Sequence, residues 1–261
     1  FAPVLDILTN PACTVIGDRA YGEEAEAAAT MGAAVIAGLQ AGGVAAAAKH
    51  FPGIGDMAPD PHETLPSRGP SPEDLRGREL LPFRAVVSDG AAIPGGATIP
   101  GGAASVMVAH AVFESIDPER PASLSPRLIK ELLRGELGFG GVAVTDDLEM
   151  GAIEEPAEAA AAGLRAGADI ALICRSEEAQ ERAHERITRA ILEEEITARE
   201  EEESLGRIGM MRDRYAGGPS SYSEEGHLAR LQETRKRVVG CGAHRALLDE
   251  VTNRAAALEE G

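Results

Sequence analysis

The sequence predicts an α/β protein built around a parallel sheet. The first observation is that short apolar runs alternate with longer segments rich in Ala, Glu and Leu, which is typical of successive strand–helix units. The second is that four of the apolar runs are followed directly by charged or imidazole side chains. The third is size and composition, because 261 residues, 44% of them hydrophobic, suffice for one sizeable domain with a buried core.

Short apolar runs and amphipathic segments define the expected elements in order. The expected strands cover residues 1–5, 44–48, 105–109, 142–144 and 169–174. The expected helices cover residues 23–40, 71–88, 125–138 and 156–165. Ser71 followed by Pro72 marks a helix start, because serine is a good N-cap and proline is tolerated in the first turn. A duplicated Ile-Pro-Gly-Gly motif at 93–96 and 99–102 predicts a flexible surface loop.

The C-terminal part of the chain has a different composition. From residue 176 onward it is dense in Glu and Arg and is expected to be entirely helical. The Gly-Gly-Pro-Ser-Ser stretch at 217–221 is the best linker candidate. We therefore predict an α/β domain over residues 1–216 and a linker with a charged helical tail over residues 217–261.

Charge and cysteine content exclude several functional classes. The formal net charge of −18 disfavours binding to nucleic acid or to anionic membranes, whose phosphates it would repel. The three cysteines are widely spaced and odd in number, which predicts neither a disulfide framework nor a zinc site. No apolar run reaches the roughly 18 residues needed to cross a bilayer.

Polar side chains follow four of the expected strands. Asp6, Lys49-His50, His110 and Asp146-Asp147 each come directly after an apolar run. Because the carboxyl ends of parallel strands meet at one edge of a sheet or barrel, these side chains are expected to converge on one face. The sequence therefore predicts an active site there.

Asp60 and His62 lie in a long Pro- and Gly-rich loop after the Lys49-His50 pair. A carboxylate beside an imidazole can orient it and stabilise its charged form, which suits proton transfer. Metal binding by His50, Asp60, His62 and His110 is conceivable, but no pair of histidines at helical spacing supports it. We expect no metal and no cofactor.

Five collinear blocks resemble glycoside hydrolase family 3, in its β-N-acetylhexosaminidase branch. The most specific is Lys-His-Phe-Pro-Gly at 49–53, followed by Asp60-x-His62. The other blocks lie at 1–6, 15–22, 106–125 and 137–151. Two positions depart from the family pattern, since Ile54 replaces a common His and Pro61 replaces a common Ser.

The resemblance assigns roles to individual residues. Asp146 matches the nucleophile of a reaction that retains anomeric configuration through a covalent glycosyl-enzyme, and its neighbour Asp147 is expected to make a structural hydrogen bond. Asp60 and His62 match a His-Asp dyad that acts as acid and base. The sugar-binding positions fall on Asp6, Arg19, Lys49, His50 and His110, with support of the nucleophile as the alternative role for His110.

The resemblance also implies a (β/α)8 barrel. The matching blocks correspond to strands four to eight of the family barrel, so we expect an incomplete barrel whose first three strands lie upstream of Phe1, followed by a helical C-terminal tail. A further part after the tail is expected as well, because His244-Arg245-Ala246-Leu247 resembles the start of a second region in longer members.

The expected activity is that of a retaining exo-β-N-acetylglucosaminidase. Its expected substrates are short amino-sugar chains such as cell-wall muropeptide or chitooligosaccharide fragments, with no nucleic acid and no membrane span. A family 3 β-glucosidase and an inactive homologue that only binds sugar are the alternatives. A cytoplasmic location is expected, with secretion or the cell surface as the alternative. No partner protein and no oligomeric state follow from the sequence.

Overall fold

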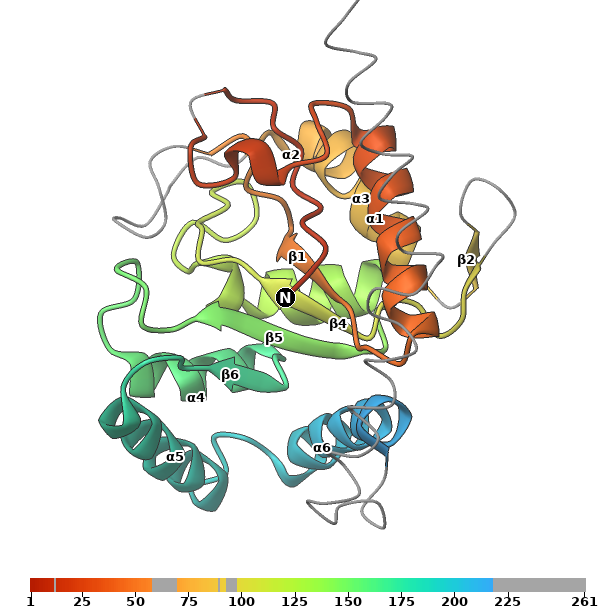
Figure 1. Cartoon of the computed structure of the whole chain (residues 1–261). Coiled ribbons are helices and arrows are strands. Elements are labelled where there is room, and N and C mark those ends of the chain that lie inside the picture. The colour runs from red at the N-terminus through yellow and green to blue at the C-terminus, as the bar shows by residue number, and fades with distance from the viewer. Residues whose placement is uncertain (12, 58–69, 89, 93–97, 218–261) are drawn as a thin grey trace, which may run out of the picture. The chain divides into compact units, whose positions relative to one another are not determined.

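The computed structural model of the chain describes residues 1–11, 13–57, 70–88, 90–92 and 98–217. Residues up to Tyr215 form one compact α/β unit around a parallel sheet (Figure 1). The strand order in this sheet is β1 (Ala47–Phe51), β4 (Ser105–Val108), β5 (Val142–Asp147) and β6 (Ile170–Leu172). The strand expected over residues 1–5 is not formed in full: this segment lies beside β1 and joins the sheet through an isolated parallel bridge between Val4 and Lys49 and backbone hydrogen bonds around it.

The strand bounds correct the sequence prediction at β1. The expected strand ended before Lys49, whereas β1 includes Lys49, His50 and Phe51. The reason is that backbone pairing continues past the polar pair, with Lys49 bridged to Val4 and Phe51 paired with Val108. The polar side chains therefore project from the strand itself, which fixes their direction more firmly than a loop would.

Helices flank the sheet and follow the predicted order. They are α1 (Ala25–Ala41), α2 (Pro72–Asp74), η2 (Leu75–Glu79), α3 (Leu81–Val87), η4 (Arg127–Glu136), α4 (Pro156–Ala166), α5 (Glu177–Leu192) and α6 (Ala198–Arg212). Short turns of helix add η1 (Gly17–Arg19), η3 (Ala122–Leu124) and η5 (Asp213–Gly217). Helix α1 packs against α3, and α4 packs against α5 (Figure 1). The predicted cap is confirmed, since the Ser71 hydroxyl accepts from the Asp74 backbone N–H at 3.1 Å.

The core is built from small and aliphatic side chains with a few phenylalanines. Phe51 and Phe83 are fully buried and meet edge to face, with ring centroids 5.3 Å apart. A Cβ on Gly32 of α1 would clash with the side chain of Leu5. The absence of a side chain at Gly32 thus lets the helix approach the N-terminal segment closely, and this approach holds Asp6 in place.

The Gly- and Pro-rich insert is not simply a surface loop. Strands β2 (Ala91–Ala92) and β3 (Thr98–Ile99) pair in antiparallel fashion at its two ends. Ile99 is fully buried in the core, so the prediction of a flexible surface loop was wrong there. Burial of this one apolar side chain anchors the end of the insert, while residues 93–97 lie outside the described part.

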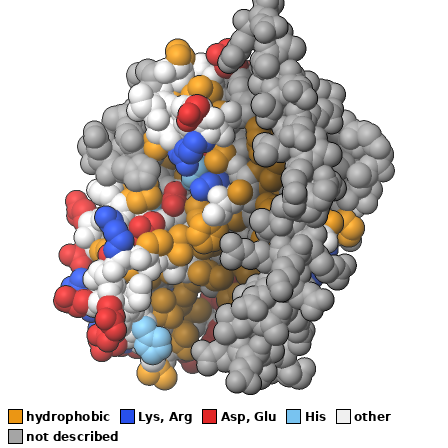
Figure 2. Space-filling view, viewed as in Figure 1, with side chains coloured by type: hydrophobic (Ala, Val, Ile, Leu, Met, Phe, Trp, Pro, Cys, Tyr) orange, Lys and Arg blue, Asp and Glu red, His pale blue; other side chains and the backbone are white. Residues whose placement is uncertain are grey.

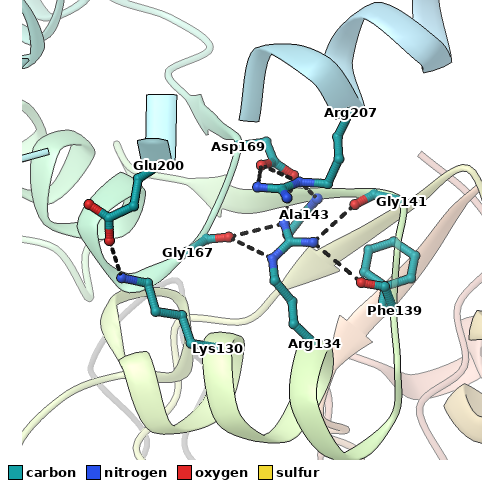
Figure 3. A network of polar contacts seen from close by, with 9 residues as sticks. All are labelled: Lys130, Arg134, Phe139, Gly141, Ala143, Gly167, Asp169, Glu200 and Arg207. Atoms are coloured by element: carbon teal, nitrogen blue, oxygen red, sulfur yellow. Dashed lines mark hydrogen bonds and ion pairs between the residues drawn. The ribbon is translucent and has the colours of Figure 1, made fainter. Parts of the chain in front are cut away.

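A buried ionic network holds helix α6 at the amino end of the sheet (Figure 3). Asp169, directly before β6, has a fully buried carboxylate that bonds to Arg134 at 2.7 Å and to Arg207 at 2.8 Å. Lys130 and Glu200 add an ion pair at 2.6 Å. Helix α6 has no buried residue of its own. We name Asp169, Arg134 and Arg207 the amino-end network, and its ion pairs attach α6 to the sheet.

The length and hydropathy of a helix decide whether it could span a membrane. None of the helices in the described ranges is both long and apolar enough to cross a membrane. The predicted helical tail over 217–261 falls almost wholly outside the described residues and stays a prediction.

Candidate active site

A small pocket opens at the carboxyl end of the sheet, where the sequence predicted a site. Its volume is about 140 Å³, below the roughly 300–1,000 Å³ of sites for drug-sized ligands. Its lining residues are Val15, Arg19, Lys49, His50, Ile54, His110, Asp146 and Met150. Figure 2 shows basic, imidazole and acidic side chains side by side near the end of β1. The pocket therefore gathers cationic, imidazole and carboxylate side chains around a small space.

The structure brings most of the predicted residues together. The ones that line the pocket are Arg19, Lys49, His50, His110 and Asp146. Asp60 and His62 lie outside the described residues, so the predicted dyad stays a prediction. Asp6 is fully buried and is absent from the pocket wall.

Asp6 lies behind the pocket and holds its floor. One carboxylate oxygen is 2.7 Å from Nδ1 of His50 and also accepts from the His50 backbone N–H at 3.1 Å. The other oxygen accepts from the Ile54 backbone N–H at 2.8 Å. Both oxygens therefore bond to the pocket floor in this structure, and Asp6 orients the His50 ring from behind. Its predicted sugar-binding role remains untested.

Lys49 and Arg19 give the pocket positive charge. Burial lowers the pKa of the Lys49 ammonium, and nearby Arg19 lowers it further, whereas Asp146 and Asp6 raise it. No ion pair to Lys49 is formed within the described ranges, while the Arg19 guanidinium donates to the Val15 carbonyl. An ammonium held close to a guanidinium without its own carboxylate can donate to ligand oxygens.

Asp146 and Asp147 at the end of β5 have carboxylates with different surroundings. Asp146 lines the pocket, and its carboxylate accepts from the Asp147 backbone N–H at 2.9 Å. The Asp147 carboxylate accepts from the backbone N–H groups of Glu149 at 3.1 Å and Cys174 at 3.2 Å. The structural hydrogen bond predicted for Asp147 is therefore confirmed, and it ties the end of β5 to the segment after β6.

His110 lines the pocket but has both ring nitrogens on protein partners. Nδ1 is 2.7 Å from the Ser123 hydroxyl, and Nε2 is 3.1 Å from the Asp147 carbonyl oxygen. Burial lowers the pKa of the ring, opposed by the nearby Asp146 charge. The ring is therefore placed to support the strand that carries Asp146, which is the alternative role expected for it.

Sequence reasoning missed a buried acid close to the pocket floor. Glu79 is only 1% exposed, and one of its oxygens bonds to Arg78 at 2.7 Å. Its second oxygen has no partner among the described residues and faces Gly53, where a Cβ would lie 3.1 Å away. Burial raises the pKa of Glu79 to about 7. The sequence around Glu79 gave no sign of its burial, because a glutamate in a charged helix is expected to face solvent.

The described side chains give no support for a metal site. Within those ranges, no group of three or more His, Cys, Asp and Glu side chains could hold a metal ion. The expectation that the site uses no metal stays a prediction.

Comparison with known proteins agrees with this geometry. The family model described as the glycosyl hydrolase family 3 N terminal domain matches residues 1–210. The chain belongs to glycosyl hydrolase family 3.

Curated relatives carry a more specific name. The chain is 41% identical over 182 residues to a beta-hexosaminidase from Alkalilimnicola ehrlichii, a match that covers 69% of this chain and 48% of that protein. It is 38% identical over 187 residues to a beta-hexosaminidase from Stenotrophomonas maltophilia, covering 70% and 51%. The chain thus spans about half the length of the curated relatives it matches.

Solved structures agree with the sequence relatives. A family 3 beta-N-acetylglucosaminidase from Paenibacillus sp. superposes with a TM-score of 0.77 at 39% identity, over 85% of this chain and 41% of that one. The beta-N-acetylglucosaminidase from Thermotoga maritima gives 0.69 at 29% identity, over 88% and 46%. The α/β fold with a parallel sheet is therefore a family property.

Proposed function

We propose that this chain is the catalytic part of a retaining exo-β-N-acetylglucosaminidase. The observation that carries the proposal is one carboxylate, Asp146, in a small pocket with Lys49, Arg19 and His50. A sugar ring offers hydroxyl oxygens to the cations and its anomeric carbon to the carboxylate. The names of the relatives support N-acetylglucosamine as the sugar.

The proposed reaction begins at Asp146. Its carboxylate attacks the anomeric carbon, and the bond from that carbon to the leaving oxygen breaks as the glycosyl-aspartate ester forms. His62, oriented by Asp60, supplies the proton to the leaving oxygen. In the second step His62 takes a proton from water, the water oxygen attacks the anomeric carbon, and the ester opens to release the sugar.

The remaining pocket residues hold the sugar and its surroundings. Lys49 and Arg19 donate charge-assisted hydrogen bonds to ring hydroxyls. His50 presents the ring edge opposite Nδ1, because Nδ1 is taken by Asp6. His110 supports the backbone at Asp147, so the nucleophile keeps its direction when the substrate binds.

The fold proposed for the complete enzyme is a (β/α)8 barrel. The five parallel segments from Val4 to β6 would be strands four to eight of that barrel, and a helical tail would follow residue 217. The parallel order of β1, β4, β5 and β6 supports this assignment, as does the match to the family domain over residues 1–210.

The proposed substrates are short chains that end in β-linked N-acetylglucosamine, including cell-wall muropeptide fragments. The small pocket supports an exo mode of action, because about 140 Å³ leaves room for one terminal ring. A cytoplasmic role in peptidoglycan recycling fits such substrates and is part of the proposal.

An assay with aryl glycosides tests the proposal. The complete enzyme that contains this chain should release the aryl alcohol from β-N-acetylglucosaminide and leave the β-glucoside almost untouched. Asp146→Ala should abolish the activity and His62→Ala should reduce it strongly. Preference for the glucoside would favour the β-glucosidase alternative. A well-folded chain that binds N-acetylglucosamine without turnover would favour the inactive homologue.

A further inference from the structure

Ser123 is a buried residue next to the pocket that no sequence motif marked as functional. It lies in the short helix η3 (Ala122–Leu124), and its side chain is fully buried. Its hydroxyl is 2.7 Å from Nδ1 of His110. The same histidine ring reaches the Asp147 carbonyl oxygen with Nε2 at 3.1 Å. Ser123, His110 and Asp147 thus form a continuous chain of hydrogen bonds that ends beside Asp146.

The direction of each bond follows from the chemistry of the end group. A carbonyl oxygen only accepts, so Nε2 of His110 must carry the proton and donate to Asp147. Burial disfavours the charged ring by lowering its pKa and keeps Nδ1 unprotonated, so Nδ1 accepts. The Ser123 hydroxyl therefore donates to Nδ1. The Asp147 carbonyl therefore selects the neutral tautomer, and the Ser123 hydroxyl completes the bonding of its ring.

The backbone fixes Ser123 in this position. Its N–H donates to the Ala109 carbonyl at 3.0 Å, and the Ala122 N–H donates to the Ala111 carbonyl at 2.8 Å. Both acceptors flank His110 on the segment that leaves β4. Helix η3 is therefore bound directly to the residues on either side of the histidine, which places the Cα of Ser123 beside the His110 ring.

We propose that Ser123 is a positioning residue for the reaction, and that its hydroxyl fixes the orientation of the His110 ring, whose Nε2–H holds the Asp146-Asp147 peptide toward the pocket. This inference rests on the proposed function, in which Asp146 is the nucleophile. Ser123 does not line the pocket, so it acts only through His110. Loss of its hydroxyl leaves Nδ1 buried without a donor, which loosens the ring and weakens the bond from Nε2–H to the Asp147 carbonyl.

The structure offers a matched control two residues away. Ser125 is also fully buried, and its hydroxyl donates to the Asp117 carboxylate at 2.7 Å. Its hydroxyl also accepts from the Leu128 backbone N–H at 3.3 Å, and it forms no hydrogen bond with His110 or a pocket residue among the described positions. Ser125→Ala therefore removes a buried hydroxyl of the same segment without touching the proposed chain, and separates loss of stability from loss of positioning.

The experiment compares Ser123→Ala, Ser123→Thr and Ser125→Ala with the wild type, each in the complete enzyme that contains this chain. Steady-state hydrolysis of an aryl β-N-acetylglucosaminide gives kcat and KM, and urea unfolding gives stability. The ¹⁵N shifts of the His110 ring report which nitrogen carries the proton. We expect Ser123→Ala to lower kcat about tenfold with KM changed less than about twofold, and to change the ring shifts. Ser123→Thr keeps a hydroxyl and should restore both, whereas Ser125→Ala should lose stability with kcat intact.

Each outcome discriminates between the claims. A wild-type His110 ring protonated at Nδ1, or an unchanged kcat in Ser123→Ala, would overturn the positioning role. An equal fall of kcat in Ser125→Ala would assign the effect to general destabilisation and would overturn it as well. A folded wild type with the expected ring shifts and no hydrolysis would instead refute the proposed function, and with it any catalytic meaning of the chain of hydrogen bonds.

Discussion

The two ends of the sheet carry charged side chains in opposite arrangements. At the amino end, the fully buried carboxylate of Asp169 is matched by Arg134 and Arg207. At the carboxyl end, Lys49 is partly buried next to Arg19, and no ion pair to it is formed in the described part of the chain. Asp146 faces the same pocket. Matched charges hold elements together, whereas unmatched charges that share a pocket are available to a ligand.

Glu79 is an intermediate case, because only one of its two carboxylate oxygens has a partner in the described part of the chain. One oxygen is matched by Arg78, and the other has no partner among the described residues. Its burial raises its pKa to about 7, unlike that of a solvated surface acid. The contrast predicts that mutations at the carboxyl end change activity, mutations at the amino end change stability, and mutation of Glu79 changes the pH dependence of stability.

The largest expected effect belongs to Asp146→Asn. Removing the nucleophile should lower kcat about 10⁴-fold, while the midpoint of urea unfolding stays within error of the wild type. The physical reason is that the Asp146 carboxylate holds no other element in place and accepts only a backbone N–H of its neighbour among the described residues. If the variant unfolded more easily but kept its activity per folded molecule, the claim that the carboxyl end serves activity rather than stability would be contradicted.

Asp169→Ala should show the reverse pattern. Breaking the network leaves two partly buried guanidinium groups without a carboxylate, at a cost of about 3–5 kcal/mol in the free energy of unfolding. Activity per folded molecule should be unchanged. Glu200→Gln is the matched control, because its ion pair with Lys130 is more exposed and should be worth less than about 1 kcal/mol. Equal losses in the two variants would contradict the structural role of the network.

Glu79 should make stability fall as the pH rises from about 4.5 to about 7. The folded protein holds this proton more tightly than the unfolded chain does, because burial raises the pKa from 4.5 to about 7. The unfolding free energy therefore decreases through that window, by on the order of 3 kcal/mol. Glu79→Gln removes the contribution, so its urea unfolding should differ less between pH 4.5 and pH 8 than that of the wild type. An identical difference in the two proteins would refute the assignment.

The smallest of these effects is expected for Lys49→Met. Loss of charged hydrogen bonds to the sugar should lower kcat/KM about 10- to 100-fold. Stability should be unchanged or higher, since burial already disfavours the ammonium, as its lowered pKa indicates. Steady-state kinetics and urea unfolding on the same preparation measure both. A large loss of stability would mean that the Lys49 ammonium forms a stabilising ion pair within the protein.

The alternation of strands and helices, and the gathering of polar strand ends, could be predicted from the sequence. Lys49, His50, His110 and Asp146 line one pocket because the carboxyl ends of parallel strands meet at one edge. Arg19, in η1, was assigned to the site only by the resemblance to the family. The end of β1 could not be predicted, since it depends on backbone pairing with Val4 and Val108, far away along the chain.

Other features depend on tertiary burial and left no local signal. Asp6 lies behind the pocket because His50 and the Ile54 backbone N–H take its oxygens. Ser123 and Glu79 gain their significance only from the groups packed against them. A one-dimensional pattern gives the type of a residue and its place in an element, but not the partners of its polar atoms.

The most direct measurement of the central claim is covalent trapping of the nucleophile. A 5-fluoro derivative of N-acetylglucosaminyl fluoride has a good leaving group and forms a slowly hydrolysed ester with the attacking carboxylate. After digestion and mass spectrometry, we expect one added 5-fluoro-N-acetylglucosaminyl group on the peptide containing Asp146, bound to that side chain. An adduct on Asp147 or Glu149, or no adduct on a chain that turns over aryl N-acetylglucosaminide, would contradict the assignment of Asp146 as the nucleophile.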